Sequence, residues 1–447
     1  MRTPICDFVS RYAESSALRL HMPGHKGAGF LGIEQLDITE ISGADSLYDA
    51  TGIIRESEET AGKLFGANTF YSTEGSSQCI RAMLQLSMQY AKRQGRKPVV
   101  AALRNVHKTF VSAVALLDIP VVWLYPKTPE SYLCCRLSAQ EVEQALLQAE
   151  QMPTALYLTS PDYLGELADI SGISQVCRRH GVLLLVDNAH GAYLRFLQPS
   201  RHPIDLGADL CCDSAHKTLP VLTGGAYLHI AKSAPAQLTA QAKNALMLFG
   251  STSPSFLILQ SLDHANAYLA DGYSEKLEDF CQKLQALKEK LTDYGYRLKG
   301  SEPLKLTIHA KPYGYTGIRF AKLLEDQGLV CELCDPDFVV MMMTPETGED
   351  GLRRLEKALL AIPRQPALTE TPPDFHRNQA VMSIREAVLA PNRTLPVQDS
   401  IGRILGAATV SCPPAVPIVL SGERIDAQAA ACFAYYGIET CTVVWGE

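Results

Sequence analysis

The sequence predicts an α/β fold whose mostly parallel sheet is covered by helices on both faces. Through the middle of the chain, short continuous apolar runs alternate with segments of helical pattern. Strands that are buried on both faces have such uninterrupted apolar runs, and their crossover connections are helices. The chain has 447 residues, which is too long for one simple core, so smaller domains should accompany the sheet.

The apolar runs and the helical segments give the predicted elements in order. The predicted strands are residues 97–103, 119–125, 154–160, 182–187, 208–213 and 338–344. The predicted helices are residues 107–118, 138–151, 173–181, 258–297 and 348–362. The second of these helices opens with Ser138 and has Glu141 three residues later, which is a capping-box pattern.

Three domains are expected along the chain. Residues 1–265 would hold an N-terminal segment and the major domain, and residues 266–365 a small α/β domain. A proline-rich linker, residues 363–379, would lead into a C-terminal domain, residues 366–447, with an irregular stretch at 412–425.

Composition and charge narrow the functional classes. The formal net charge is -7 and no dense basic stripe is present, so we expect no nucleic-acid partner. No apolar stretch is long enough to cross a bilayer, and the N-terminus lacks a signal-peptide pattern. We therefore expect a cytoplasmic protein with reduced cysteines. The Cys331–Cys334 pair lacks a second ligand pair for zinc and is interpreted as core packing.

An aspartate and a lysine follow two predicted strands. Asp187 ends the apolar run 182–187, and Lys217 comes shortly after the run 208–213. In parallel sheets, ligands bind beyond the carboxyl ends of the strands. An amine and a carboxylate at neighbouring ends suit pyridoxal phosphate, since the amine binds the aldehyde and the carboxylate pairs with the ring nitrogen. Alternatively, Asp187 is a helix cap or structural ion partner, and Lys217 an exposed loop residue.

Hydroxyl and imidazole side chains supply the rest of a candidate cofactor site. Ser76 and Ser77 open an amphipathic helical pattern, where free backbone N–H groups can bind a phosphate. Ser214 and His216 could also donate to the phosphate, and His107 could stack on the ring. The serines could instead be ordinary helix caps, and His107 a capping or core residue. A hydroxyl cluster, Ser251, Thr252 and Ser253, is either a cap or a further set of phosphate donors.

The motifs in this order resemble those of the Orn/Lys/Arg decarboxylase family, pyridoxal phosphate enzymes of the aspartate aminotransferase fold (fold type I). The resemblance is nearly end to end and implies a three-layer αβα major domain. It is carried by "HMPGHKGAGF", "STEGSS", "RNVHKT", "TSPDYLG", "DNAHGAY", "SAHKTL", "GSTSPSF", "MSIREA" and "CPPAVPIVLSGERI". The chain looks like a short member of the family, without an additional N-terminal regulatory-type domain.

The resemblance implies a role for each of these residues. Lys217 would carry the cofactor as an internal aldimine, Asp187 would pair with the pyridinium nitrogen, and His107 would stack on the ring. His190 would flank the cofactor. The phosphate would be held by Ser76, Ser77, Ser214 and His216, and by Ser251, Thr252 and Ser253 of a neighbouring subunit. The resemblance therefore also implies a homodimer, or a higher homo-oligomer, with shared sites.

The implied reaction is α-decarboxylation of arginine, lysine or ornithine to the amine and CO2, as in polyamine biosynthesis. Glu40 and Asp45 are candidates for binding the substrate's distal cation, although a solvated loop is slightly favoured for them. Glu74, Asp162 and Ala215 depart from the usual family residues, and the two acids would add negative charge near an anion site.

Three alternatives stay open at this point. An aminotransferase or β-lyase of the same fold would need an arginine for the substrate carboxylate, which the sequence does not clearly mark. A non-catalytic relative would keep the fold without the cofactor. His21 and His25 have a spacing that a metal permits, but no third ligand is near, so no metal site is expected.

Overall fold

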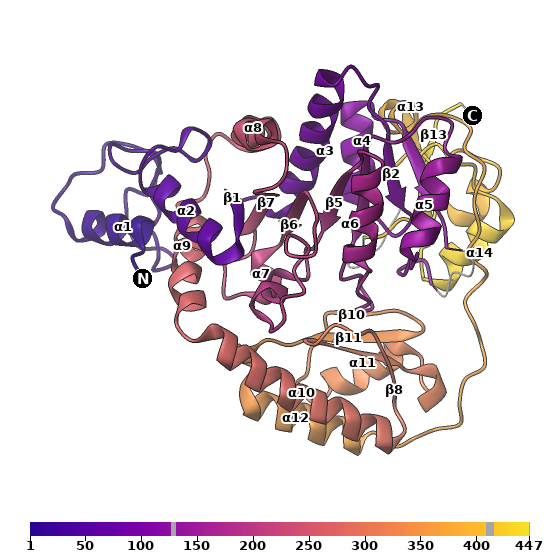
Figure 1. The fold of residues 1–447 in the computed structure, drawn as a ribbon. Coiled ribbons are helices and arrows are strands. Elements are labelled where there is room, and N and C mark those ends of the chain that lie inside the picture. Colours follow the sequence, from indigo (N-terminus) through magenta and orange to yellow (C-terminus); the bar gives the residue numbers. More distant parts are fainter. Residues whose placement is uncertain (127–130, 408–414, 447) are drawn as a thin grey trace. The chain divides into compact units, whose positions relative to one another are not determined.

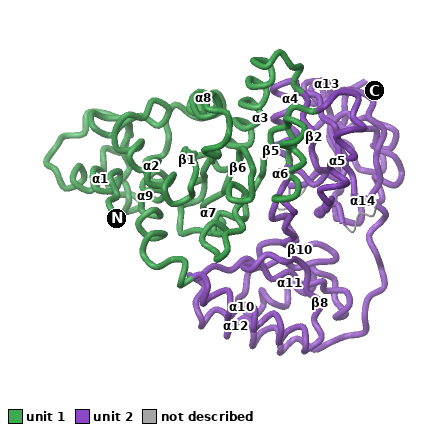
Figure 2. The backbone as a smooth tube through the Cα atoms, viewed as in Figure 1, with its two compact units in different colours: residues 1–98, 153–157, 170–276 green, residues 99–152, 158–169, 277–447 purple. Residues whose placement is uncertain are grey.

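The computed structural model describes residues 1–126, 131–407 and 415–446. The chain forms two compact units, shown in separate colours in Figure 2. Unit 1 comprises residues 1–98, 153–157 and 170–276, and unit 2 comprises residues 99–152, 158–169 and 277–447, apart from the residues not described. Each unit draws on segments that are distant in the sequence, and the expected division into three consecutive domains stays a prediction.

A seven-stranded sheet has the strand order β1-β7-β6-β5-β4-β2-β3. Its strands are β1 (Ala67–Ser72), β2 (Val100–Leu103), β3 (Val121–Leu124), β4 (Ala155–Thr159), β5 (Leu183–Asp187), β6 (Leu210–Asp213) and β7 (Ala226–Ala231). The pairs β2–β3 and β5–β6 are parallel, whereas β7 runs antiparallel to both β1 and β6. The mostly parallel sheet is confirmed, and β2 to β6 lie within the predicted runs, but β1 and β7 were not predicted.

Helices of unit 1 precede and follow these strands. They are α1 (Pro4–Glu14), α2 (Ile53–Phe65), α3 (Gly75–Arg93), α6 (Ile170–Arg179), α7 (Ala215–Thr218), α8 (Ala236–Met247) and α9 (Phe256–Ala270). The helical pattern predicted over residues 258–297 is confirmed for most of its length, but it is divided into two helices. The chain forms α9 and then α10 (Tyr273–Tyr294), because Gly272 adopts a left-handed conformation, with φ of 68°, that ends the first helix.

Unit 2 contains a second sheet, whose four strands are all antiparallel to their neighbours. In order they are β10 (Leu333–Cys334), β11 (Phe338–Met342), β9 (Lys305–His309) and β8 (Arg297–Lys299), with α11 (Gly317–Glu325) and α12 (Gly348–Ala361) following in the same part of the chain. The helices α4 (Lys108–Leu117) and α5 (Ala139–Gln148) match their predictions, and the Ser138–Glu141 capping box is present.

The C-terminal part of unit 2 shares a hydrophobic core with the second sheet, since Leu405 and Phe433 cluster with Phe338. It contains α13 (Ile384–Leu389), β12 (Asn392–Pro396), α14 (Ala427–Tyr435) and β13 (Thr440–Val444), drawn in yellow in Figure 1. The linker, residues 363–379, has no helix or strand, as predicted. The predicted irregular stretch 412–425 is without helix or regular strand from residue 415 onward, and residues 412–414 lie outside the described residues.

The interpretation of Cys331 and Cys334 as core residues is wrong. Cys334 is exposed and Cys331 is only partly buried, because both lie at or beside the short edge strand β10, which pairs on one side only.

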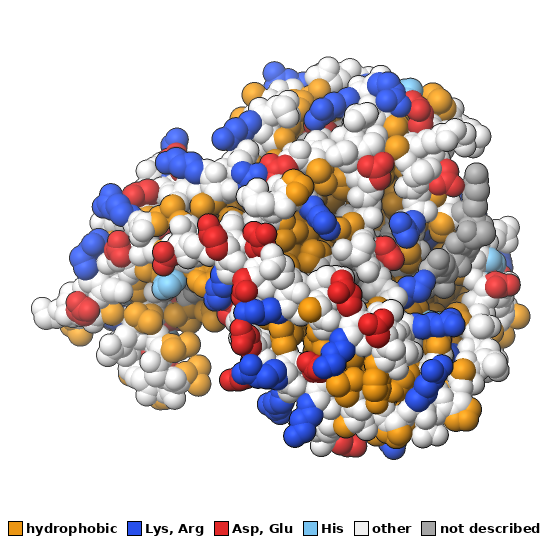
Figure 3. Space-filling view, turned by 60° about the horizontal axis from the view of Figure 1, so that its bottom comes forward, with side chains coloured by type: hydrophobic (Ala, Val, Ile, Leu, Met, Phe, Trp, Pro, Cys, Tyr) orange, Lys and Arg blue, Asp and Glu red, His pale blue; other side chains and the backbone are white. Residues whose placement is uncertain are grey.

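Acidic and basic side chains are interspersed on the face drawn in Figure 3. Among the described residues, no helix is long and apolar enough to cross a membrane.

Candidate active site

The parallel pairing of β5 and β6 brings the two key residues of unit 1 together. Asp187, the last residue of β5, is in register with Cys212 of β6. The chain leaves β6 through Ser214 directly into α7, which carries Lys217. Since the carboxyl ends of neighbouring parallel strands meet at one edge of a sheet, this connection places the lysine beside the aspartate.

Asp187 is a buried carboxylate with few partners. Its Oδ2 accepts a hydrogen bond of 3.0 Å from the Tyr157 hydroxyl. Its Oδ1 accepts one of 3.2 Å from the backbone N–H of Ala189 and a longer one, of 3.6 Å, from the Cys212 thiol. Burial raises the pKa of Asp187, whereas the Tyr157 hydrogen bond and the positive charge of Lys217 oppose that rise. The carboxylate is therefore short of compensating positive charge, and a cationic ring nitrogen would supply it.

The amine of Lys217 is held by an imidazole. Lys217 Nζ lies 2.8 Å from Nε2 of His190, which is 4% exposed and follows β5 three residues after Asp187. An ammonium has only donors, so His190 Nε2 must be the acceptor when Lys217 is charged. The same imidazole nitrogen can take a proton from the ammonium, which leaves the neutral amine that a lysine needs to act as a nucleophile.

Two serines from distant segments meet at the start of α3. Ser214 Oγ donates to Ser76 Oγ at 2.8 Å, and α3 begins at Gly75, the residue before Ser76. A Cβ placed on Gly75, whose φ is 71°, would meet no atom within 4 Å, so open space lies in front of the helix N-terminus. Backbone N–H groups and hydroxyls facing open space suit a phosphate. Ser77 follows in the first turn, and His216 Nδ1 contacts the Gly225 carbonyl at 3.0 Å.

The remaining predicted residues are placed differently. His107 belongs to unit 2, where it is the N-cap of α4 and its Nδ1 accepts from the Thr109 backbone N–H at 3.1 Å. This is the capping role that the sequence left open, and stacking on a ring stays a prediction. The segment Ser251–Ser253 is exposed, and the Ser251 backbone N–H donates to the Glu74 carboxylate.

Sequence reasoning missed a buried polar network behind the strand ends. Asp213 is fully buried, and its Oδ2 lies 3.0 Å from His202 Nε2 and 3.2 Å from His229 Nε2. Burial opposes its ionisation, but the two imidazoles outweigh it and hold the pKa of Asp213 well below the usual range. Asn188 donates to the other oxygen at 2.7 Å, which ties the loop after Asp187 to β6. The sequence signal that could have revealed this network is the occurrence of polar residues, such as Asp213 and His229, inside or next to apolar runs.

The acidic candidates for the distal cation behave unequally. Asp45 accepts backbone hydrogen bonds at the start of α2, including those of Thr51, Gly52 and Ile54. Burial opposes the charge, but these bonds prevail and lower the pKa of Asp45. It is therefore a structural cap and not part of a solvated loop. Glu40 is exposed and accepts from Ser46 at 2.6 Å, so its carboxylate stays accessible.

The three departures from the family pattern also have distinct surroundings. Ala215 is fully buried as the first residue of α7, and Glu74 is exposed as the N-cap of α3. Asp162 lies in unit 2 and is 4% exposed, and burial raises its pKa to about 6. Glu74 therefore adds negative charge next to the proposed phosphate cradle.

The metal interpretation of His21 and His25 finds other partners. His21 Nε2 lies 2.5 Å from the Tyr12 hydroxyl, and His25 pairs with Asp37 at 3.2 Å. Within the described part of the chain, the only group of three possible metal ligands that are close together is His202, Cys211 and Asp213. These residues already bond to one another inside the network described above.

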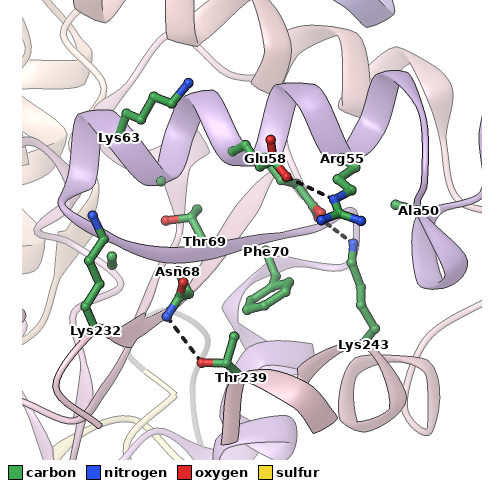
Figure 4. Close-up of a pocket in the computed structure, with 13 residues that line it drawn as sticks. Ala50, Arg55, Glu58, Lys63, Asn68, Thr69, Phe70, Lys232, Thr239 and Lys243 are labelled. Atoms are coloured by element: carbon green, nitrogen blue, oxygen red, sulfur yellow. Dashed lines mark hydrogen bonds and ion pairs between the residues drawn. The ribbon is translucent and has the colours of Figure 1, made fainter. Parts of the chain in front are cut away.

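A separate cavity of about 500 Å³ lies in unit 1 among α2, β1 and α8 (Figure 4). Lys243 pairs with Glu58 at 2.5 Å and Arg55 with Glu59 at 2.9 Å. None of the predicted cofactor residues is among the residues that line it. The cavity is therefore not part of the site built around Lys217.

Comparisons with known proteins place the chain in a family. The family model of the Orn/Lys/Arg decarboxylase major domain matches residues 3–296. The chain belongs to the Orn/Lys/Arg decarboxylase family. An arginine decarboxylase of Halalkalibacterium halodurans is 29% identical over 95% of this chain and 91% of its own length, and the uncharacterized protein YaaO of Bacillus subtilis is 28% identical over 96% and 93%.

Solved structures show the fold of this family member. The Francisella novicida lysine decarboxylase LdcF superposes with a TM-score of 0.80, covering 99% of this chain and 81% of that one, at 16% identity. A serine palmitoyltransferase from Sphingomonas wittichii superposes over 80% of this chain and 83% of its own, with a TM-score of 0.56 at 13% identity. The predicted fold class, fold type I with a mostly parallel sheet, is confirmed.

Proposed function

We propose that this family member is a pyridoxal phosphate-dependent decarboxylase that converts a basic amino acid to its amine and CO2. The observation that carries the proposal is the grouping of Lys217, His190 and Asp187 at neighbouring strand ends, where the buried Asp187 carboxylate lacks compensating positive charge. Arginine is the first substrate to test, since family members with similar full-length sequences are named arginine decarboxylases. Lysine and ornithine follow, and the amine product would suit polyamine biosynthesis.

The residues of unit 1 fit the cofactor by their donor chemistry. Asp187 would hold a proton on the ring nitrogen, and Lys217 Nζ would bind the aldehyde covalently. Ser76, Ser77, Ser214 and the N-terminus of α3 would bind the phosphate. Bound pyridoxal phosphate supplies an electron sink for the bond between Cα and the carboxylate. His107, together with Ser251, Thr252 and Ser253 of the partner subunit, is proposed to complete the site in a cytoplasmic homodimer.

The chain's own groups would manage the proton of the reaction. When the substrate carboxylate leaves as CO2, one proton must be added at Cα. The amine of Lys217 is suited to deliver it, because His190 Nε2, 2.8 Å away, can return a proton to Nζ. Asp187, His190 and Ser214 are all less than 5% exposed, so water is largely excluded from these groups and their electrostatic interactions are strong.

The test is release of ¹⁴CO2 from carboxyl-labelled arginine, lysine and ornithine by the cofactor-loaded enzyme. Wild type should release CO2 from at least one of them, and Lys217→Ala should lose at least about 1,000-fold in rate because it lacks the nucleophile. Lys232→Ala, which alters an exposed lysine of the same unit, is the matched control and should retain activity. Wild type that releases no CO2 from any of the three contradicts the proposal.

A further inference from the structure

The C-terminal part of unit 2 contains a cavity of about 360 Å³ that has no place in the proposed reaction. Its walls come from the segment after β3, the linker at residues 371–375, and α14. Cys432 of α14 contacts the Pro373 carbonyl, and Gln428 donates to the Asp374 carbonyl at 2.8 Å. The linker is thus fixed against α14, and the cavity has the volume of a small-molecule site.

Two tyrosine rings form the aromatic wall of this cavity. The rings of Tyr132 and Tyr436 are 4.6 Å apart at their centroids and inclined by 64°, an edge-to-face pair. Tyr132 is 8% exposed, and both Tyr132 and Ile418 belong to a hydrophobic cluster as well as to the cavity lining. The faces of such rings attract organic cations. The aliphatic side chain of Ile418, which also lines the cavity, could contact a hydrocarbon chain.

The charges around this cavity favour a positive ligand. Among the described residues that line it, Asp374 alone carries a charge. Burial raises the pKa of Cys432 to about 11, and the charges of Asp426 and Asp374 add to that rise, which places the Asp374 carboxylate within range of the cavity wall. Burial, followed by the negative charges of Asp335 and Asp337, also raises the pKa of both tyrosines.

The Phe375 ring, which also lines the cavity, already has a cation beside it. The Arg104 guanidinium lies 5.3 Å from the centroid of the Phe375 ring, and it donates to the carbonyls of Pro417 and Ile418 at 2.7 and 2.9 Å. Arg104 does not line the cavity, and Glu423 lies within range of its charge. The tyrosine pair and Asp374 therefore stay available for a second cation.

We propose that this cavity binds an aliphatic organic cation, an alkylammonium or alkylguanidinium. Its charged end would lie at the Asp374 carboxylate and the tyrosine faces, and its hydrocarbon chain against Ile418. The site is distinct from the residues around Lys217, and it does not depend on the proposed decarboxylation. A failure to release CO2 would leave this proposal standing, and a failure to bind cations here would leave the decarboxylase proposal standing.

The experiment is calorimetric titration of the pyridoxal phosphate-loaded protein with 1,5-diaminopentane and with the uncharged 1,5-pentanediol. Binding of the diamine at this site should persist in Lys217→Ala. It should weaken at least about tenfold in Asp374→Asn and in Tyr436→Leu, which is about 1.4 kcal/mol. Tyr436→Phe should retain binding because the ring remains, and Asp399→Asn, at an exposed carboxylate in the same part of the chain, should bind like wild type.

Two results would overturn the cation site. The first is equal affinity for the diol and the diamine, which would identify a merely apolar cavity. The second is diamine binding that is lost in Lys217→Ala and unchanged in Asp374→Asn, which would assign the binding to the site around Lys217. Thermal unfolding of each variant checks that lost binding reflects the side chain and not the fold.

Discussion

Tyr157→Phe removes one hydroxyl from the buried surroundings of Asp187. That hydroxyl donates a 3.0 Å hydrogen bond to a fully buried carboxylate. A hydrogen bond to a charged group contributes about 1.5–3 kcal/mol. Burial already raises the pKa of Asp187, and loss of this hydrogen bond should raise it further, because the bond favours the charged form. Less ionised Asp187 pairs less well with a protonated ring nitrogen, so pyridoxal phosphate should bind about 10- to 100-fold more weakly.

The assay is a titration of the cofactor-free protein with pyridoxal phosphate at pH 7.5, followed by visible absorbance. Tyr227→Phe is the matched control, because the Tyr227 hydroxyl is buried in the same unit and has no hydrogen-bond partner among the described residues. Its affinity should equal that of wild type. If Tyr157→Phe also binds the cofactor with unchanged affinity, the Tyr157 hydrogen bond does not support the charge of Asp187 and the reasoning is refuted.

Three further predictions concern stability. Burial raises the pKa of Asp162 from 3.8 to about 6, so its ionisation destabilises the fold as pH rises through that range. Asp162→Asn should therefore add up to about 3 kcal/mol to the free energy of urea unfolding at pH 8 and little at pH 4. Equal gains at both pH values would contradict this prediction. Hydrogen bonds from backbone N–H groups, chiefly that of Leu31, lower the pKa of Glu34 to about 2, so the order of its loop should decline as pH falls from 4.5 to 2. Pepsin should therefore cut Glu34→Gln faster than wild type at pH 4.5. Equal cleavage rates would show that the Glu34 charge does not order the loop. A Cβ on Gly62 would lie 2.8 Å from the Ala67 carbonyl oxygen. Gly62→Ala should therefore lower the free energy of urea unfolding by about 1–3 kcal/mol, although alanine has the higher helix propensity. A gain in stability would show that α2 can move away from β1.

The accuracy of the sequence predictions varied with how local the signal was. The apolar runs that became β4, β5 and β6 were evident because strands buried on both faces need continuous apolar sequence. The strand β7 was missed although it is fully buried, because its neighbours in the sheet, β1 and β6, are set by antiparallel pairing that no local pattern shows. The break at Gly272 was missed because glycine is tolerated inside helical patterns and ends a helix only when its φ turns positive.

The candidate site shows the same division. Asp187 and Lys217 could be found because each follows an apolar run, and parallel topology then requires their strand ends to meet. Tyr157 could not be assigned, because it lies inside an apolar run and its hydroxyl finds Asp187 only when β4 and β5 are neighbours. The pairing of Lys217 with His190 likewise depends on the loop after β5 folding over α7.

The sequence by itself determined the fold class, the order of the strands β2 to β6 and the set of chemical groups at the strand ends, since hydrophobic periodicity and residue type are local properties. Only the tertiary structure decided which partner each polar group has and how strongly it is buried. Asp45 illustrates the difference: a carboxylate that the sequence offered to the substrate is instead used by the backbone N–H groups of α2. Hydrogen bonding and desolvation depend on atoms brought together from distant segments, and these two effects set the charge state on which function depends.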